Sequence, residues 1–432
     1  MIYLKTKLFF NSLKVKFLNN KKVIENYFFM TVLQILNSLF YLIIYPFLIR
    51  TLGAESYGHY VFAFSISVYF VSLVQFGFDT PALKSISEFP NDKKIHSEVI
   101  SAVFFSKLVL FFLSLIIFLP LLVTVSLFRV NYLLFIVCYL QVFSNILFPT
   151  WYFQGIQKMK VVTYIQLSLK LISLPILFVF IRHPNDIVKF AAITILTALI
   201  GGIIAMAILR YSHSIKLIWI PVRKLKQVFK DAVPFFLSSS MNTIKQQTAT
   251  ILIGSFFSMT DVALYDLAMK IYSVPTTLIS SINSALFPKM LNSKWDTIKK
   301  VINIENLIGV FVILALVIFG KWIILIMGGT EMIEAYPILI ILSFSVFTVL
   351  TVGAIFSFVF IPKGLYKYVA MNQFLALFGF VLFSSVGLVF FSNMLILPLA
   401  FAFSALVELV YSYFLLNKLK NDFKKNNYNF IV

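Results

Sequence analysis

Long apolar runs separated by short polar segments recur along the whole chain. Crossing the hydrocarbon core of a membrane takes roughly 20 mainly apolar residues per helix, and these runs have that length. The alternating segments of about ten residues that are typical of a membrane β-barrel are absent. The pattern predicts an all-α polytopic membrane protein with twelve spans, at 27–49, 60–81, 99–123, 132–150, 161–181, 188–209, 233–257, 262–287, 304–327, 335–361, 367–391 and 394–416.

The twelve spans form two groups of six, separated by the longest polar segment. The expected organisation is a basic cytoplasmic N-terminal arm at 1–26, a first six-helix lobe at 27–210, a cytoplasmic linker at 211–232, a second six-helix lobe at 233–417 and a basic cytoplasmic tail at 418–432. The linker pattern indicates an interfacial helix. The arm is expected to lie on the inner leaflet.

A weak internal repeat supports the division into two lobes. Shifting the sequence by 205 positions aligns Asn37 with Asn242 and Tyr60 with Tyr265. Duplicated halves of this kind commonly form a substrate site at their interface. We therefore expect a central cavity between two lobes.

Composition and charge agree with a membrane location. Of the 432 residues, 60% are hydrophobic and only 12% charged, with a net charge of +20. Twenty-seven basic residues fall on the side of the termini, and three, Arg50, Arg129 and Arg182, fall in the opposite loops. This asymmetry predicts cytoplasmic termini and removes the need for a nucleic-acid partner. The single cysteine, Cys138, excludes disulfides within the chain.

Lysine side chains inside the predicted spans are the strongest candidates for function. Lys245 lies roughly 16 Å from either end of its span, at about 1.5 Å per residue, which is too far for its ammonium group to reach the headgroups easily. Ser238, Asn242 and Lys245 share one helical face, and Gln246 adjoins it. The face predicts one wall of a hydrated cavity, and a structural polar seam between helices is the alternative.

The next span repeats this design. Asp266, Lys270 and Ser273 follow one helical face, although Asp266 and Lys270 could simply neutralise each other. For Lys107 and Lys170, which lie nearer to a span end, extension to the headgroups is equally compatible with the sequence. Among the acidic residues, Glu408 could pair with a lysine or hold a coupling proton. Asp79 could serve a helix end or ion coupling.

No enzyme signature is present in the sequence. Glycine-rich phosphate loops, paired-histidine metal motifs and clusters of aspartates are all absent, and the predicted outer loops are short. We expect no catalytic residue, no metal and no cofactor. Transport would then draw on a proton or sodium gradient or on substrate turnover, with Asp266, Glu408 and Asp79 as candidates for ion coupling.

Three segments resemble one family of membrane proteins. They are "YPFLIRTLGAESYGHYVFA" (Tyr45–Ala63), "WYFQGIQKMK" (Trp151–Lys160) and "SMTDVALYDLAMKIYSVPTTLISSINSALFPKM" (Ser258–Met290). They resemble the polysaccharide repeat-unit flippases of the O-antigen (Wzx) type, and the likeness runs over residues 30–412. These flippases belong to the multidrug/oligosaccharidyl-lipid/polysaccharide exporter superfamily, which also holds the multidrug and toxin extruders and the lipid II flippase.

The resemblance implies two lobes of six helices that open alternately to either side of the membrane. It implies translocation of undecaprenyl-diphosphate-linked oligosaccharide repeat units to the outer leaflet of a bacterial inner membrane, for O-antigen, capsule or exopolysaccharide synthesis. Expected partners are membrane lipids, a polysaccharide polymerase and a chain-length regulator. A multidrug-type ion-coupled antiporter is the alternative within transporters, and a membrane glycan polymerase or ligase is the alternative from another class.

The resemblance also adds Arg50, before the first outer turn, to the residues expected to contact substrate. The complete set of expected cavity residues is Lys245, Lys270, Asn242, Gln246, Ser238, Ser273, Arg50, Lys170 and Lys107.

Overall fold

The computed structural model describes residues 2–290, 293 and 295–425, without the side chains of 2–24, 27, 238, 284–285, 288–289 and 419–425. Every regular element in this part of the chain is helical. The elements are α1 (Ile2–Gln75), α2 (Asp79–Glu88), α3 (Lys93–Thr124), α4 (Ser126–Val130), α5 (Tyr132–Leu147), α6 (Thr150–Gly155), α7 (Met159–Phe180), η1 (Pro184–Asp186), α8 (Ile187–Tyr211), α9 (Val222–Phe256), α10 (Met259–Met290), α11 (Trp295–Gly328), η2 (Thr330–Met332), α12 (Ala335–Ile355), the π-helical η3 (Phe356–Phe360), α13 (Tyr366–Phe390) and α14 (Ile396–Lys425).

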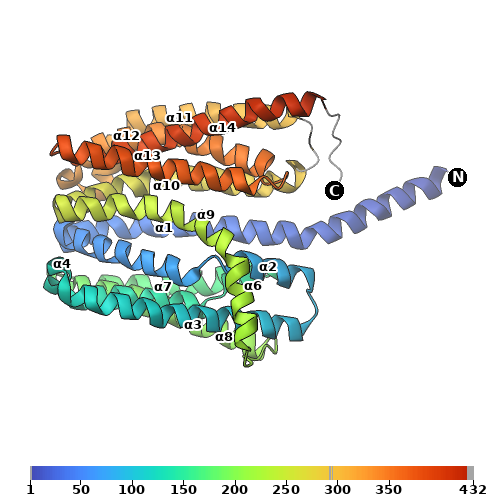
Figure 1. Ribbon diagram of the computed structural model, residues 1–432, viewed down its shortest axis with the longest axis horizontal. Helices are drawn as coiled ribbons and strands as arrows, with labels where there is room; N and C mark the ends of the chain where they lie inside the picture. Colours follow the sequence, from blue (N-terminus) through green and yellow to red (C-terminus); the bar gives the residue numbers. More distant parts are fainter. Residues whose placement is uncertain (1, 291–292, 294, 426–432) are drawn as a thin grey trace.

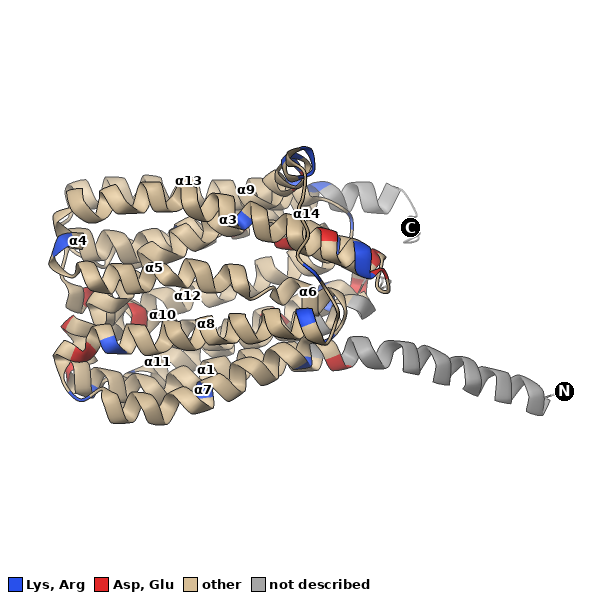
Figure 2. Cartoon of the chain, turned by 90° about the horizontal axis from the view of Figure 1, so that it is seen from below, with Lys and Arg blue, Asp and Glu red and all other residues tan. Residues whose placement is uncertain are grey.

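The long helices run side by side in one bundle. Figure 1 shows α11–α14 along one side, α2–α8 along the other, and α1, α9 and α10 between them. Charged residues gather mostly at the two ends of the bundle (Figure 2), as expected where only the ends of helices meet water. The prediction of an all-α multi-pass membrane protein is confirmed.

The predicted number of twelve spans is not confirmed. In the described residues, nine helical segments are long and apolar enough to cross a membrane. The predicted first and second spans fall in a single element, α1, and the predicted seventh and eighth spans fall in α9 and α10, which are not among the nine. The polar residues along α9 and α10 lower the mean hydropathy of these two helices.

A single glycine divides α1 into two segments. Gly53 has φ 77° and ψ 160°, a left-handed backbone conformation that glycine adopts without steric cost. The segments on either side correspond to the predicted spans 27–49 and 60–81. The predicted outer loop is therefore a sharp kink within a continuous helical element.

Contacts between distant loops match the predicted alternation of the first spans across the membrane. At one end of the bundle, the backbone N–H of Met159 donates to Asn26 Oδ1 at 2.9 Å. At the other end, Asn131 Nδ2 lies 3.3 Å from His59 Nδ1. The loops expected on one side thus meet each other, whereas the assignment of that side to the cytoplasm remains a prediction.

The predicted interfacial linker is helical only in its second part. Helix α9 begins at Val222, and residues 213–221 have no helical structure. The first part of α9 crosses the end of the bundle before the helix turns to run with the others (Figure 1). Pro234 lies inside α9, and a proline within a helix removes one backbone hydrogen bond and permits such a bend. The expected domain boundaries remain predictions.

Close backbone contact joins α1 to α10 near the kink. A Cβ atom placed on Gly58 would lie 1.8 Å from the backbone oxygen of Met259. Nearby, the hydroxyl of Tyr45 donates to the backbone oxygen of Ala263 at 3.2 Å. The short segments before the second and eighth predicted spans therefore touch through Gly58 and main-chain atoms, and the Tyr45 hydroxyl joins the first predicted span to the eighth.

Replacing Gly58 with alanine should weaken this contact. The added methyl group would meet rigid backbone, so we expect Gly58→Ala to destabilise the protein by at least ~1–3 kcal/mol, the usual cost of overpacking. Gly353→Ala in α12 is the matched control, because nothing lies within 4 Å of a Cβ atom there. Thermal unfolding of the purified variants measures the difference, and equal unfolding temperatures would contradict the close contact.

Candidate functional site

A polar cavity of about 510 Å³ lies inside the bundle. Its walls come from α1, α5, α6, α7 and α8 on one side and from α9 and α10 on the other. Volumes of roughly 300–1,000 Å³ are typical of small-molecule sites. The lining side chains with polar groups are Tyr41, Tyr45, Tyr57, Tyr60, Ser65, Gln141, Ser144, Asn145, Thr150, Gln166, Lys170, Ser173, Thr194, Thr197, Gln246, Gln247, Thr250, Tyr265, Asp266, Lys270 and Ser273.

Two lysines from different parts of the chain converge in this cavity. Lys170 Nζ lies 5.6 Å from the ring centroid of Tyr41, and Lys270 Nζ lies 4.2 Å from the same centroid. The two ammonium groups are therefore within about 10 Å of each other. Lys170 belongs to α7, in the first predicted lobe, and Lys270 belongs to α10, in the second. Each predicted lobe therefore supplies one cation. An aromatic face stabilises a nearby cation without neutralising it.

Neither ammonium group is fully compensated by a carboxylate. Lys170 Nζ donates to Asn37 Oδ1 at 2.5 Å, a neutral partner. Lys270 Nζ lies 3.9 Å from Asp266 Oδ1, which is at the outer limit of an ion pair. Asp266 also accepts a hydrogen bond from the hydroxyl of Tyr57 at 3.0 Å. Two lysines and one aspartate line the cavity, so it attracts anions.

Amide side chains add hydrogen-bonding capacity to the walls. Gln141, Asn145 and Gln166 line the cavity from the first group of helices, and Gln246 and Gln247 line it from α9. Each amide offers both donors and an acceptor. Together they match a ligand with many hydroxyl groups.

Gln246 is among the expected cavity residues, whereas Gln141, Asn145 and Gln166 are not, because the expectation was centred on the helices that carry intramembrane charge. A usable signal was present: Gln141 and Asn145 are four residues apart, as are Gln166 and Lys170. This spacing places both members of each pair on one helical face. The cavity tyrosines had no comparable signal, because tyrosines are frequent along the whole chain.

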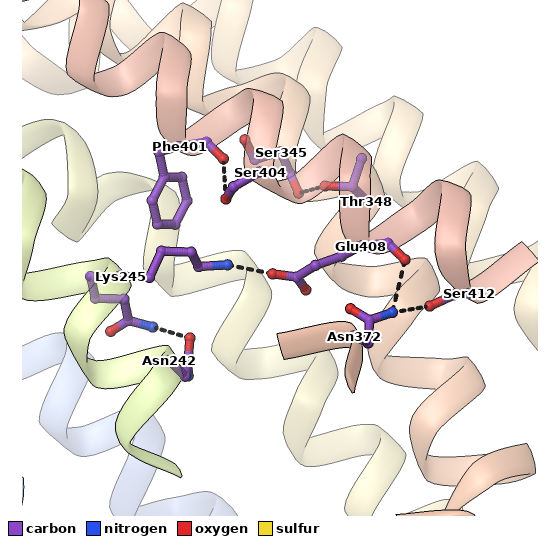
Figure 3. Close-up of polar contacts among 10 residues, drawn as sticks. Asn242, Lys245, Ser345, Thr348, Asn372, Phe401, Ser404, Glu408 and Ser412 are labelled. Atoms are coloured by element: carbon purple, nitrogen blue, oxygen red, sulfur yellow. Dashed lines mark hydrogen bonds and ion pairs between the residues drawn. The ribbon is translucent and has the colours of Figure 1, made fainter. Parts of the chain in front are cut away.

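The structure places Lys245 beside Glu408, away from the residues that line the cavity. This lysine is not among the residues that line the cavity. Instead its ammonium group forms an ion pair with Glu408 Oε1 of α14 (Figure 3). Lys245 is 5% exposed and Glu408 is 6% exposed. Successive helical residues point about 100° apart, so Gln246 and Gln247 face the cavity while Lys245 faces α14.

Asn372 and an aromatic ring complete the surroundings of this ion pair. Lys245 Nζ lies 5.3 Å from the ring centroid of Phe401. Asn372 Nδ2 donates to the backbone oxygen of Glu408 at 3.0 Å and to Ser412 Oγ at 2.8 Å (Figure 3). The alternative that Glu408 pairs with a lysine is thus the arrangement that the structure shows. These residues hold α9, α13 and α14 together.

The remaining expected residues divide between the cavity and other places. Lys270, Lys170, Gln246 and Ser273 line the cavity, and Ser273 Oγ donates to the backbone oxygen of Lys270 at 2.8 Å. Asn242 lies outside the cavity and accepts a hydrogen bond from Gln246 at 3.3 Å. The side chain of Ser238 lies outside the described residues.

Three further expected residues lie away from the cavity. Lys107 pairs with Asp79 at 2.7 Å, and Asp79 is the first residue of α2, a position typical of a helix-end role. Arg50 is exposed, three residues before the kink at Gly53. The expected contact of Lys107 and Arg50 with a substrate stays a prediction, as does ion coupling by Asp79. Among the described residues, no group of three His, Cys, Asp or Glu side chains could hold a metal ion.

Separating the buried ion pair should destabilise the protein. Removing one partner leaves an uncompensated charge in a low dielectric, so we expect Lys245→Met and Glu408→Leu each to cost about 3–5 kcal/mol. The double variant should recover most of the loss, because it leaves no buried charge. Unfolding of the purified single and double variants measures this coupling.

The pair of exposed Lys189 and buried Asp186, 2.7 Å apart, provides the control, because the backbone N–H groups of Arg182 and His183 also donate to the Asp186 carboxylate. Lys189→Met should change stability by less than about 1 kcal/mol. If Lys245→Met were as stable as this control, the ion pair with Glu408 would not be a structural link.

The bundle, the cationic cavity and the helix arrangement define a multi-pass membrane protein with a transporter fold. The structure resembles an inward-facing multidrug resistance MATE family transporter of the MOP superfamily, with TM-score 0.67, 15% identity and coverage of 93% of this chain and 99% of that one. It also resembles the lipid II flippase MurJ in an inward closed conformation, with TM-score 0.67, 12% identity and coverage of 91% and 86%. At these identities the likeness shows the fold alone, and it confirms the expected MATE-like architecture.

The sequence identifies the family. A model of the family described as "Polysaccharide biosynthesis protein" matches residues 23–294, which is more than half of the chain. The protein belongs to this family, and the resemblance noted in the sequence is confirmed.

Two named relatives are transporters rather than enzymes. The chain is 26% identical over 272 residues to a "Putative O-antigen transporter" of Escherichia coli K12, and 27% identical over 255 residues to a protein of the same name from Shigella dysenteriae. The alignments cover 63% and 59% of this chain, and they span 66% and 64% of the relatives' lengths.

Proposed function

We propose that this protein is a flippase that moves undecaprenyl-diphosphate-linked oligosaccharide repeat units from the inner to the outer leaflet of a bacterial plasma membrane. The observation that best supports the proposal is the cavity with Lys170 and Lys270 on opposing walls. Family membership and the names of the relatives point to the same activity.

A lipid diphosphate cannot cross hydrocarbon without shielding of its charge. Lysine ammonium groups are mobile point charges, which suit an anion that must be bound and then released. Lys170 and Lys270 are each only partly compensated, by Asn37 and Asp266. The arriving diphosphate would exchange these weak partners for charge-assisted hydrogen bonds.

The rest of the lining suits the sugars of the repeat unit. Amides and hydroxyls hydrogen-bond to sugar hydroxyls, and tyrosine rings offer flat apolar surface beside a polar group. Tyr45, Tyr57 and Tyr60 lie together on the cavity wall, with the rings of Tyr45 and Tyr57 5.2 Å apart. The polyprenyl chain would remain in lipid at a lateral gap between the two groups of helices.

The placement of the two lysines supports alternating access as part of this proposal. One belongs to each group of helices, so relative movement of the groups would change the distance between the ammonium groups. The site would bind the diphosphate when they converge and release it when they separate. A multidrug-type antiporter for cations is disfavoured, because such a cavity would hold more acidic than basic groups.

Asp266 is the best-placed residue for coupling to a proton or sodium gradient. It lines the cavity and lies 3.9 Å from Lys270, whereas Glu408 is held by Lys245 and Asp79 lies outside the cavity. We place both termini in the cytoplasm, on the basis of the charge asymmetry. A polysaccharide polymerase and a chain-length regulator remain proposed partners.

Removing the cavity lysines should stop export. In a strain lacking this protein, complementation with Lys170→Ala or Lys270→Ala should leave complete lipid-linked repeat units in the inner leaflet, with surface glycan reduced at least about tenfold, because each lysine would supply ~1.5–3 kcal/mol to diphosphate binding. Leaflet-specific labelling of the repeat units and immunoblotting of the protein provide the measurement.

Lys321→Ala is the matched control for this experiment, because Lys321 is an exposed residue of α11 outside the cavity. Full export by the Lys170→Ala and Lys270→Ala proteins would remove the basis of the proposal. Export of single units that stay unpolymerised would instead favour the polymerase alternative.

Asp266→Asn tests the coupling. In proteoliposomes with an imposed proton or sodium gradient, we expect transport by Asp266→Asn to lose its dependence on the gradient, because an amide cannot bind and release the coupling ion. Glu331→Gln, at an exposed position, is the control. A gradient dependence equal to that of the unmodified protein would exclude Asp266 as the coupling residue.

A further inference from the structure

A second pocket, of about 570 Å³, lies at the end of the bundle and apart from the central cavity. It is formed by the loop between α2 and α3, the loop between α6 and α7, and the residues that follow α8. Figure 1 places α2 and α6 at this end. By the predicted orientation it opens on the cytoplasmic side.

The pocket lining is basic. Lys93, His96, Lys158 and His213 contribute to it, and the lining contains no aspartate or glutamate. Lys158 Nζ donates to His213 Nε2 at 3.3 Å, so its charge is met by a neutral ring. Burial and the adjacent Lys158 ammonium lower the pKa of His213, which keeps that ring neutral near pH 7.

The carboxylates near this pocket contact groups other than Lys93 and Lys158. Glu88 lies 3.8 Å from Lys84. Asp92 accepts hydrogen bonds from the backbone N–H groups of Lys94 and Ile95 at the start of α3. Within the described ranges, neither Lys93 nor Lys158 forms an ion pair with a carboxylate. The two lysines therefore remain available to an anion that enters from solution or from the headgroup layer.

The side chains of the pocket are held in place before any ligand arrives. His96 Nε2 lies 2.9 Å from the backbone oxygen of Phe89, and its ring packs edge-on against Tyr152, with centroids 5.6 Å apart. The ring of His213 lies 5.6 Å from that of Tyr152. Gln157 has φ 56°, a left-handed conformation that is costly for a residue other than glycine and is often found at ligand sites.

An additional nitrogen lacks a partner beside the pocket. His213 Nδ1 is buried and, among the described residues, has no hydrogen-bond partner. Because Nε2 accepts from Lys158, the neutral ring has its proton on Nδ1, which is a donor. Buried donors are almost always satisfied, so this unpartnered N–H is an unusual feature of the pocket end.

We propose that this pocket binds a phosphate-bearing group. The ligand would be either the headgroup of an anionic lipid in the adjacent leaflet or a soluble phosphate compound, since both offer the same oxygens to the two lysines. The site is separate from Lys170 and Lys270, and its occupancy does not depend on the transport that we propose for the central cavity.

Calorimetric titration with inorganic pyrophosphate tests the soluble source. The full-length protein is placed in nanodiscs of phosphatidylcholine, which has no net charge. We expect a saturable component of binding that persists in Lys170→Gln/Lys270→Gln, where the central cavity lacks its lysines, and that weakens at least about tenfold in Lys93→Gln/Lys158→Gln, since each lost charge-assisted bond is worth about one factor of ten or more. Lys84→Gln, at an exposed position of the same end, should bind as the unmodified protein does.

Nanodiscs that contain phosphatidylglycerol test the lipid source. If the headgroup is the ligand, phosphatidylglycerol should raise the unfolding temperature of the unmodified protein and not that of Lys93→Gln/Lys158→Gln. The variant Lys93→Arg/Lys158→Arg keeps both charges and should retain binding in either arm, which separates loss of charge from misfolding.

Three results would overturn the proposal. Unchanged binding by Lys93→Gln/Lys158→Gln in both arms would show that the lysines are not ligands. The absence of any effect of pyrophosphate and phosphatidylglycerol on the unmodified protein would show that the pocket takes no phosphate. Loss of pyrophosphate binding only in Lys170→Gln/Lys270→Gln would assign the binding to the central cavity, which would support the proposed function instead.

Discussion

The cost of charge in a low dielectric governs the interior of this protein. A lysine within a membrane span must be paired with an opposite charge or must face water or a ligand. Lys245 meets the first requirement through Glu408, with both side chains almost fully buried. Lys170 and Lys270 meet the second, in a cavity where one asparagine and one aspartate give them only partial compensation. The first pair stabilises the fold, and the second leaves positive charge for a substrate.

The cavity and the buried ion pair involve different helices. The cavity is lined by α1, α5, α6, α7, α8, α9 and α10, and no described residue of α11 to α14 is among its lining residues. Helices α13 and α14 are instead joined to each other and to α9 by Asn372, Glu408 and Lys245. The ion pair therefore links the second group of helices without taking part in the cavity wall.

Local sequence patterns predicted the helical membrane fold and the presence of charged groups inside it. They could not predict which lysine faces the cavity, because that depends on partners far away in the chain. Glu408 is 163 residues from Lys245, and Tyr57 is 209 residues from Asp266. The helical period places Lys245 and Gln246 on adjacent faces, but it does not say which of the two faces turns to the other helices. Distance from the ends of a span identified Lys245 as costly to bury, which is correct, and the cost is met by an ion pair rather than by water.

The structure of the protein with an undecaprenyl-diphosphate oligosaccharide bound is the most direct test of the central claim. Electron cryomicroscopy of that complex should show the diphosphate within about 4 Å of the Lys170 and Lys270 ammonium groups, the distance at which unit charges interact strongly away from bulk water. The pair of Lys245 and Glu408 should remain intact in that complex. A diphosphate bound to Lys245, with Glu408 displaced and Lys170 and Lys270 unoccupied, would contradict the assignment of the cavity.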